Sequence, residues 1–393
     1  LELADPADAE GQDLIKQALR NHPGPVVIRA TPEASVPLDP GHVTLRVPPL
    51  TESERADFWR VALAEAGLHA GDVDGLAARY RVGPGVIAHV IAQAVLRRGS
   101  EAPAGNDNQP GDAGPMLEEV ARQHIATRLA HISSHVTRLA KWEQVALPDD
   151  VHDSIREFIA RIKHRRQVYE HWGFGRKVAK GVGLSALFAG PPGTGKTMVA
   201  GIIADELGLD LYQIDLSKVV SKWVGETEKN LGELFDAAEA GHAILLFDEA
   251  DALFAKRTQV QTVNDRYANL EVNYLLQRME AYAGIVILTT NHETAIDEAF
   301  RRRLSLKIDF AVPEADERAR LWRALLPAEA EVAADIDVDA LARRFEMTGG
   351  YIKNATVRAA FLAADEGAPI AMRHLVRAAR AEYQTMGKVV SHL

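Results

Sequence analysis

The segment 190–197 combines glycines, a lysine and a hydroxyl residue in the spacing of a phosphate-binding loop, G-x-x-x-x-G-K-[ST]. It lies between an apolar run typical of a strand and a helix-like stretch that begins at Met198. Backbone amides around such glycines turn toward phosphate oxygens, and the helix N-terminus adds positive charge. We expect Lys196 to reach the β- and γ-phosphates and Thr197 to ligate Mg²⁺. The predicted loop consists of Gly190, Pro191, Pro192, Gly193, Thr194, Gly195, Lys196 and Thr197.

Two carboxylates follow the apolar run 243–247. The carboxyl ends of parallel strands face the ligand in open α/β sheets, so the sequence predicts both carboxylates at the same edge as the loop. Asp248 is expected to hold the metal, directly or through water, and Glu249 to orient and deprotonate an attacking water. A solvated strand end is the alternative for such a pair alone; its place downstream of a complete phosphate loop favours the nucleotide site.

Asn291 ends the next strand-like run, 288–291. Its amide is suited to hydrogen-bond a lytic water or the γ-phosphate. An ordinary polar strand end is the alternative, and the position of Asn291 in the order of motifs favours the functional interpretation.

Two further motifs indicate contacts with other polypeptides. Three successive arginines occupy 301–303, and a guanidinium supplied to a neighbouring subunit's site would speed phosphoryl transfer by about 10³-fold or more. An exposed basic turn is the alternative. Lys222, Trp223 and Val224 form a loop whose aromatic side chain would grip a polypeptide, with partial burial in its own domain as the alternative.

Short apolar runs alternate with helix-like stretches from residue 183 onward, which predicts a parallel sheet covered on both faces. The chain is expected to be helical after Pro313. The expected strands are 183–190, 209–217, 242–250, 284–291 and 304–310.

The first hundred residues contain a partial repeat of the end of the chain. Residues 52–60 (ESERADFWR) match 315–323 (ADERARLWR), and 72–80 (DVDGLAARY) match 337–345 (DVDALARRF). Strand-like runs at 25–31 and 43–47 precede the first copy. We therefore interpret 1–99 as the back half and helical lid of a module whose complete copy follows; because the chain starts at Leu1 rather than Met, we expect the front half to lie outside this sequence.

A linker and a helix separate the two copies in this interpretation. Residues 100–115 are rich in Gly, Pro, Asn and Asp and lack an apolar period, which is typical of a flexible linker. Over 116–143, apolar residues recur every three or four positions and predict one linker helix, packed on its own domain or on a partner. The stripe comprises Ile125, Leu129, Ile132, Val136 and Leu139.

Composition excludes several classes of protein. With 393 residues, 47% hydrophobic and 25% charged, the chain is neither disordered nor collagen-like. It has no cysteine, which excludes disulfides and thiolate metal sites and fits a reducing cytoplasm. No apolar run is long enough to span a membrane. The net charge of −10 disfavours a general nucleic-acid partner.

The ordered motifs GPPGTGKT, SKWVGETEKNL, LLFDEADALF, ILTTN, IDEAFRRRL and TGGYIKNA resemble those of AAA ATPases, over about residues 144–390. The resemblance implies an α/β fold: a P-loop NTPase parallel sheet in an ATPase core over 144–312, a helical lid over 313–393 and a partial, degenerate AAA-like module before them. It also implies ATP with Mg²⁺, a homo-oligomeric ring of six subunits, and a cytoplasmic location.

The resemblance assigns roles to particular residues. It places Glu249 and Asn291 in hydrolysis, and Arg302 and Arg303 at the two arginine-finger positions, although the usual Pro-Gly between these arginines is missing. Trp223 falls on the aromatic position of the central-pore loop, with Lys222 and Val224 beside it, as in katanin-like and spastin-like remodellers. Asp150 and Val151 fall where the adenine pocket begins, and Gly350 falls at the start of the lid helix.

A narrower resemblance links SKWVGETEKNL, WGFGRK and TVNDRYANLEVNYLLQRMEAY to bacterial two-module AAA proteins often encoded beside contractile injection systems. In that group the first module is degenerate and the second is active. The expected function is ATP-driven remodelling of a protein substrate through the pore loop. Two alternatives stay open: an ATP-dependent assembly scaffold that does not thread its substrate, and a nucleic-acid motor, which the acidic charge disfavours.

Overall fold

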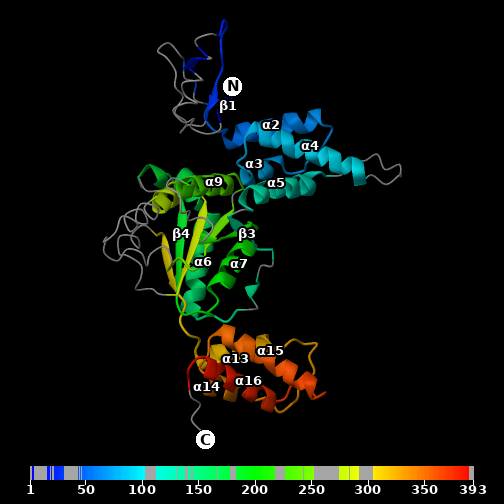
Figure 1. Ribbon diagram of the computed structural model, residues 1–393, viewed down its shortest axis with the longest axis vertical. Helices are drawn as coiled ribbons and strands as arrows, with labels where there is room; N and C mark the ends of the chain where they lie inside the picture. Colours follow the sequence, from blue (N-terminus) through cyan, green and yellow to red (C-terminus); the bar gives the residue numbers. More distant parts are fainter. Residues whose placement is uncertain are drawn as a thin grey trace. The chain divides into compact units, whose positions relative to one another are not determined.

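The computed structural model divides the chain into two compact units, Leu1–Pro49 and Leu50–Leu393 (Figure 1). It describes residues 2–3, 16, 17, 19, 22–30, 43, 45, 47–101, 112–130, 132–137, 140–142, 145–165, 167–177, 183–216, 226–241, 243–251, 274–282, 284–291 and 304–388. In the first unit, β1 (Glu2–Leu3) pairs in parallel with β2 (Arg29–Ala30), which falls within the strand-like run 25–31. The run expected at 43–47 shows no strand at its described residues, whose apolar side chains are exposed.

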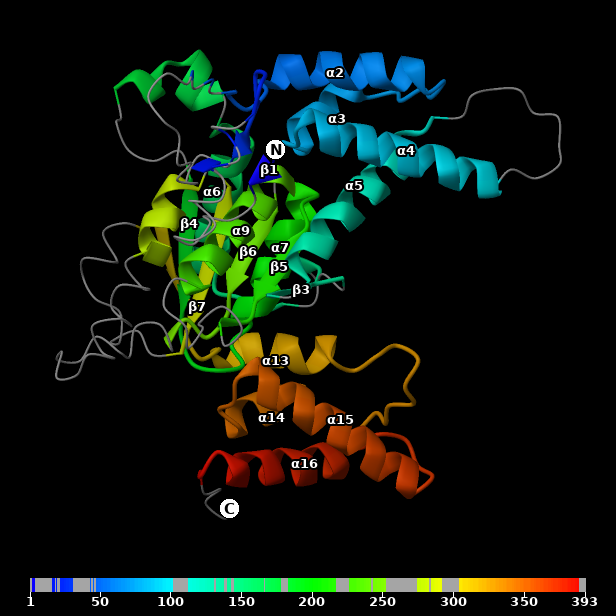
Figure 2. The same ribbon diagram turned by 45° about the horizontal axis from the view of Figure 1, so that its top comes forward.

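A six-stranded sheet forms the centre of the second unit, in the order β3-β5-β6-β7-β4-β8 (Figures 1 and 2). Its long strands confirm the five expected from sequence, and they run parallel to one another. Only β3 is antiparallel, pairing with β5 at one edge. The bounds are β3 (Ser133–His135), β4 (Leu184–Ala189), β5 (Leu211–Ile214), β6 (Ile244–Phe247), β7 (Ile285–Thr290) and β8 (Leu306–Asp309).

Helices cover both faces of the sheet because its strands are apolar on both sides. Leu245 and Phe247 of β6 pack in the cluster that contains residues of α9 (Glu226–Gly241), whereas Ile244 and Leu246 pack in the cluster that contains residues of α6 (Asp149–Lys163) and α7 (Lys196–Leu207). Alternate residues of one strand thus serve opposite cores. The α/β class with a parallel sheet is confirmed.

Four helices follow the sheet and have a hydrophobic cluster of their own, which includes the buried residues Trp322, Phe345 and Leu375. They are α13 (Ala315–Ala324), α14 (Val338–Arg344), α15 (Gly349–Asp365) and α16 (Met372–Thr385). This bundle is the helical region expected after Pro313. Short η2 (Gln167–His171) and η3 (Phe174–Arg176) segments precede the sheet's first parallel strand. Among the helices described, none is both long and apolar enough to cross a bilayer.

An equivalent four-helix bundle precedes the sheet: α2 (Glu52–Glu65), α3 (Val73–Arg79), α4 (Pro84–Glu101) and α5 (Gly114–Leu129). The internal repeat is therefore structural as well as sequential. Trp59 and Trp322, at matching positions of α2 and α13, are both fully buried. Asp72 caps α3 by accepting from the Gly75 amide, and Asp337 caps α14 by accepting from the Ala340 amide.

The buried arginines of the two bundles make the same hydrogen bonds. The Arg55 Nε donates to the Ala77 carbonyl at 3.0 Å, and its Nη1 donates to the Leu50 carbonyl. In the second bundle the Arg318 Nε donates to the Ala342 carbonyl at 2.8 Å, and its Nη1 donates to the Pro313 carbonyl, two residues before α13. Each arginine therefore joins the first two helices of its bundle to the chain that enters it.

The single linker helix expected over 116–143 is corrected by the structure. The helix α5 ends at Leu129, and 133–135 form β3, whose backbone pairs with β5. The apolar spacing continues through 132–136 because Ile132 and Val136, which flank β3, each pack against a hydrophobic cluster. Between α5 and β3, the Ser133 hydroxyl donates to the Leu129 carbonyl at 2.8 Å. Moreover, α5 packs against α3 and α4, so it completes the first bundle. The segment 100–115 thus connects two helices of this bundle, although 102–111 lie outside the described residues.

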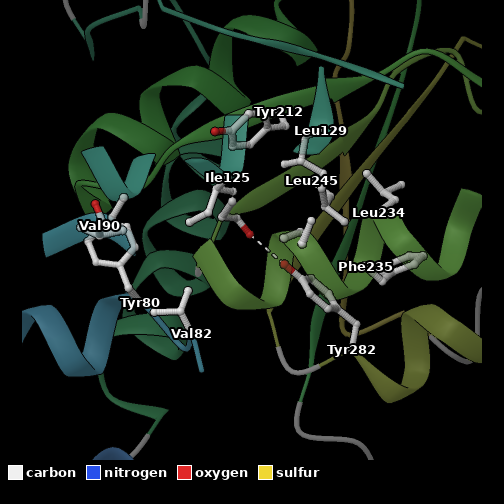
Figure 3. Packing of buried hydrophobic residues seen from close by; sticks show 14 of the residues in the cluster. Tyr80, Val82, Val90, Ile125, Leu129, Tyr212, Leu234, Phe235, Leu245 and Tyr282 are labelled. Carbon is white, nitrogen blue, oxygen red and sulfur yellow. Dashed lines mark hydrogen bonds between the residues drawn. The ribbon is translucent and has the colours of Figure 1, made fainter. Parts of the chain in front are cut away.

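The first bundle packs on the sheet domain through α5 and α9 (Figure 3). Ile125 and Leu129 of α5 share one buried cluster with Leu234 of α9 and Tyr212 of β5. The helices come so close that a Cβ on Gly241 would lie 3.0 Å from Ile125. The described part of the chain therefore has one continuous core from the first bundle to the sheet.

Candidate functional site

The predicted phosphate loop connects β4 to α7 at the carboxyl edge of the sheet. Gly193 has a φ of +77°, and a Cβ there would lie 2.7 Å from the Thr348 hydroxyl. At Gly190 a Cβ would collide with the Phe310 carbonyl after β8. Glycine is needed at these positions because the loop passes against two other segments in conformations that side chains disfavour.

Lys196 is the first residue of α7, and it is buried. Its ammonium donates to the carbonyls of Gly190 and Pro191 at 2.7 and 2.9 Å, and to the Asn291 Oδ1 at 2.9 Å. Burial lowers the pKa of Lys196, while the nearby carboxylates of Asp248 and Asp251 act to raise it. The structure thus brings the predicted lysine and the predicted strand-end amide together.

Asp248 lies where β6 ends, facing the start of α7. The Thr197 hydroxyl is 3.3 Å from its Oδ2 and 3.5 Å from its Oδ1. Gln213 of β5 donates from Nε2 to Oδ2 at 2.9 Å, and the Thr289 hydroxyl of β7 donates to Oδ1. Side chains from both neighbouring strands therefore hold this carboxylate.

Glu249 follows with an exposed side chain and a φ of 52°. Among the described residues it is the only non-glycine residue with positive φ, a conformation that is uncommon outside glycine and frequent at functional sites. Its backbone amide donates to the Thr289 hydroxyl at 3.1 Å. The structure thus fixes the backbone of Glu249 directly after the end of β6 and leaves its side chain exposed.

A second acidic residue supports Asn291. The Asp251 carboxylate accepts from the Asn291 backbone amide at 3.0 Å and from the Thr290 hydroxyl. These bonds fix the end of β7, from which the Asn291 side chain reaches Lys196. Sequence reasoning did not assign roles to Gln213, Thr289 or Asp251; the threonine and the aspartate stood inside the motifs already recognised, whereas no local pattern marks the glutamine.

The start of α15 contacts the phosphate loop. The Gly350 amide donates to the Gly193 carbonyl at 3.0 Å, which places the predicted Gly350 at the site. Thr348, the N-cap residue, is buried, and its hydroxyl has no partner among the residues described. The helical bundle and the loop therefore meet through backbone as well as side-chain atoms.

The predicted adenine-pocket residues lie at the start of α6. Asp150 is exposed, and Val151 is buried in the cluster beneath α7. Nearer the loop is Val145, whose Cγ2 would be 3.7 Å from a Cβ on Gly195. Ala146 packs instead against the cluster of the C-terminal bundle. The segment 145–151 thus connects the sheet domain, the loop and the bundle.

Five of the predicted functional residues lie outside the described part of the chain. They are Arg302 and Arg303, expected to act in a neighbouring subunit's site, and Lys222, Trp223 and Val224, expected to contact a polypeptide.

The donor set suits a magnesium nucleotide. Thr197 and Asp248 offer hydroxyl and carboxylate oxygens, which Mg²⁺ prefers, and Mg²⁺ sites commonly use one or two carboxylates together with substrate phosphates and water. Within the described ranges no cluster of three or more His, Asp or Glu residues could hold an ion alone. The loop amides, Lys196 and the N-terminus of α7 supply the complementary positive charge.

Comparison with known families agrees with this geometry. Residues 186–312 match the ATPase family associated with various cellular activities (AAA). Residues 314–385 match the contractile injection system ATPase helical domain. The first match runs from within β4 to just past the end of β8, and the second covers α13 to α16.

Several individual proteins from different organisms are similar to part of this chain. The chain is 38% identical over 183 residues to ATPase family gene 2 protein of Schizosaccharomyces pombe, covering 45% of this chain and 22% of that protein. It is 29% identical over 243 residues to Fidgetin-like protein 1 of Xenopus tropicalis, covering 60% and 36%. It is 32% identical over 213 residues to Cell division protein C of Sulfolobus acidocaldarius, covering 52% and 53%.

The chain thus spans between 22% and 53% of the lengths of these relatives. The matched residues nevertheless include the whole loop, the two carboxylates and Asn291. The chain therefore contains an AAA ATPase domain, and this domain is followed by a contractile injection system ATPase helical domain.

Proposed function

We propose that this chain binds ATP with Mg²⁺ and hydrolyses it to drive the remodelling of a protein substrate. The observation that carries the proposal is the pair Asp248–Glu249 at the end of β6: one carboxylate is held by flanking strands beside Thr197, and the next is exposed in a left-handed backbone conformation. These two environments suit different tasks. The fixed carboxylate of Asp248 suits metal binding, and the exposed carboxylate of Glu249 suits proton abstraction.

Each residue of the site has a task in this proposal. The loop amides and Lys196 bind and orient the phosphates, and Thr197 and Asp248 would hold Mg²⁺, which neutralises charge developing on the phosphoryl group. Glu249 takes the proton from the attacking water, and Asn291 orients the γ-phosphate or that water. Because Lys196 and Asn291 are already hydrogen-bonded, the two are held in position relative to each other.

We infer that copies of the chain form a ring, in which Arg302 or Arg303 of one copy completes the site of the next. A guanidinium is suited to this task because it stabilises charge on a transferring phosphoryl group. The contact between Gly350 and Gly193 supports coupling of the nucleotide site to the C-terminal bundle, so that hydrolysis can move one domain relative to another. Trp223, between Lys222 and Val224, would pass that motion to a polypeptide.

The variant Glu249→Gln tests the proposal. It keeps the size of the side chain but cannot accept the proton, so it should retain ATP while turnover falls by about 10²-fold or more. Glu65→Gln, an exposed position of α2, is the matched control and should hydrolyse ATP like the wild type. Unchanged turnover in Glu249→Gln would refute the role of this base, and a wild-type chain that fails to bind ATP would refute the site.

An assembly scaffold is the second candidate, favoured by the match of residues 314–385 to the contractile injection system ATPase helical domain. In this role bound ATP would hold the copies of the chain together as an assembly platform for a contractile injection system, and hydrolysis would release them for another round of assembly. Trp223→Ala distinguishes the two. A remodeller would lose substrate processing and keep its ATPase activity, whereas a scaffold would retain its assembly function.

A further inference from the structure

We propose that Thr289 is a positioning residue that couples the metal-binding carboxylate to the catalytic base; this rests on the proposed function. Thr289 lies on β7, is buried, and stands opposite the end of β6. Its hydroxyl touches both halves of the carboxylate pair: it accepts from the Glu249 amide at 3.1 Å and donates to the Asp248 Oδ1.

The direction of these bonds follows from the chemistry of the groups. A backbone amide can only donate and a carboxylate only accept, so the single hydroxyl proton of Thr289 must point at Asp248. The chain of donors therefore runs from the Glu249 amide through Thr289 to Asp248. The Thr289 carbonyl adds a third tie by accepting from the Ala250 amide at 2.9 Å.

This arrangement explains how Glu249 keeps its left-handed backbone conformation. Such a conformation is costly for a residue with a Cβ and persists where the surroundings hold it. The amides of Glu249 and Ala250 both bind Thr289, and these bonds fix the backbone on each side of the Cα of Glu249. Removal of the Thr289 hydroxyl would release the first bond and, at the same time, a donor to Asp248.

Gln213 provides a comparison for Thr289 because, among the residues described, its side chain is hydrogen-bonded to Asp248, whereas Thr289 is hydrogen-bonded to both Asp248 and Glu249. Its amide donates to the other oxygen, Oδ2, at 2.9 Å from the opposite neighbouring strand. Each Asp248 oxygen thus has one strand-borne donor, and the Thr197 hydroxyl, the other proposed metal ligand, lies 3.3 Å from Oδ2 and 3.5 Å from Oδ1. Loss of Gln213 should affect the metal, whereas loss of the Thr289 hydroxyl should affect both the metal and the base.

The experiment compares Thr289→Val, which keeps the shape and removes the hydroxyl, with Thr289→Ser, which restores it, and with Gln213→Leu. Mn²⁺ binding in the presence of a non-hydrolysable ATP analogue is followed by electron paramagnetic resonance, nucleotide affinity is measured in chelator, and kcat is measured at saturating Mg²⁺. Thr356→Val is the control, since its buried hydroxyl donates to a carbonyl within α15 at 2.9 Å.

Thr289→Val and Gln213→Leu should each weaken Mn²⁺ binding by about tenfold, the usual effect of removing a residue that orients a metal ligand. Metal-free nucleotide affinity should be unchanged in both. At saturating Mg²⁺, kcat should recover in Gln213→Leu and stay low in Thr289→Val, and Thr289→Ser should be close to the wild type. Thr289→Ala serves the same comparison if the valine variant does not fold.

Wild-type Mn²⁺ affinity together with wild-type kcat in Thr289→Val would overturn the inference while leaving the proposed function standing. An equal loss of metal-free nucleotide affinity, or full recovery of kcat at saturating Mg²⁺, would also overturn it. A wild-type chain that neither binds nor hydrolyses ATP would overturn the proposed function, and this inference with it.

Discussion

Lys196 and Asn291 lie 95 residues apart in the sequence, and the ammonium of the first donates to the Oδ1 of the second at 2.9 Å. The bond joins the start of α7 to the end of β7 across the carboxyl edge of the sheet. It brings the lysine proposed to bind phosphate into contact with the residue proposed to face the γ-phosphate, so a substitution at either residue should change nucleotide binding.

Lys196→Met should weaken ATP binding by about tenfold or more, because hydrogen bonds to charged groups contribute about 1.5–3 kcal/mol each. The fold should persist, since the variant removes a buried cation whose pKa burial already lowers. Nucleotide titration and thermal unfolding measure the two effects. Lys163→Met, at an exposed position of α6, is the control, and wild-type affinity in Lys196→Met would contradict the assignment.

Gly193→Ala should lower ATP affinity and disturb the contact with α15. A methyl group at φ +77° is strained by about 1–2 kcal/mol, and it would lie 2.7 Å from the Thr348 hydroxyl and 3.3 Å from the Gly350 amide. Gly67→Ala is the matched control, because its φ of +65° is similar and no heavy atom lies within 4 Å of its Cβ position. Backbone strain should lower the melting temperature of both variants, whereas ATP affinity should fall in Gly193→Ala only; equal affinities would refute the role of the close approach.

Arg318→Met and Arg55→Met should both destabilise the chain, by about 2–3 kcal/mol each, because each leaves two buried or partly buried carbonyls without a charged donor. Lysine should not rescue either variant, since one ammonium cannot reproduce the planar fork of a guanidinium. Chemical unfolding measures the loss. Arg320→Met, whose side chain is 53% exposed, should change stability by about 0.5 kcal/mol or less. A large loss of stability in only one of the two variants would show that the Arg55 and Arg318 networks do not contribute equally.

Asp112 should make the first bundle sensitive to acid. Its Oδ1 accepts from the Gly114 and Gly71 amides at 2.9 Å each, and these bonds hold the pKa of Asp112 below its ordinary value. A lowered pKa in the folded state contributes stability above the unfolded pKa of about 3.9, and this stability is lost as the pH falls through the folded value. The melting temperature of the wild type should therefore fall more steeply than that of Asp112→Asn below about pH 4. Parallel curves would contradict the prediction.

Much of the site could be predicted because its residues stand in local patterns. The loop 190–197 and the pair Asp248–Glu249 each follow an apolar run, and the physical rule that parallel strands end at one edge was enough to place them together. The repeat was equally visible, since Trp59, Trp322 and the capping aspartates must recur wherever the same packing recurs.

Other features required the fold. Gln213 and Thr289 become important only because β5 and β7 flank β6, and strand order is decided by long-range packing rather than by local sequence. The helix expected over 116–143 was too long for the same reason: Ile132 and Val136 continue the helical spacing, yet the residues between them, 133–135, pair with β5 at the sheet edge.

The sequence by itself determined the chemistry available to this protein, because the types and spacing of Lys196, Thr197, Asp248 and Glu249 follow from what phosphate and Mg²⁺ require. Only the tertiary structure decided how that chemistry is oriented. The direction of the Asp248 carboxylate, the backbone of Glu249 and the contact of Gly350 with the loop each depend on donors and acceptors that lie far apart along the chain and meet only after the strands have paired.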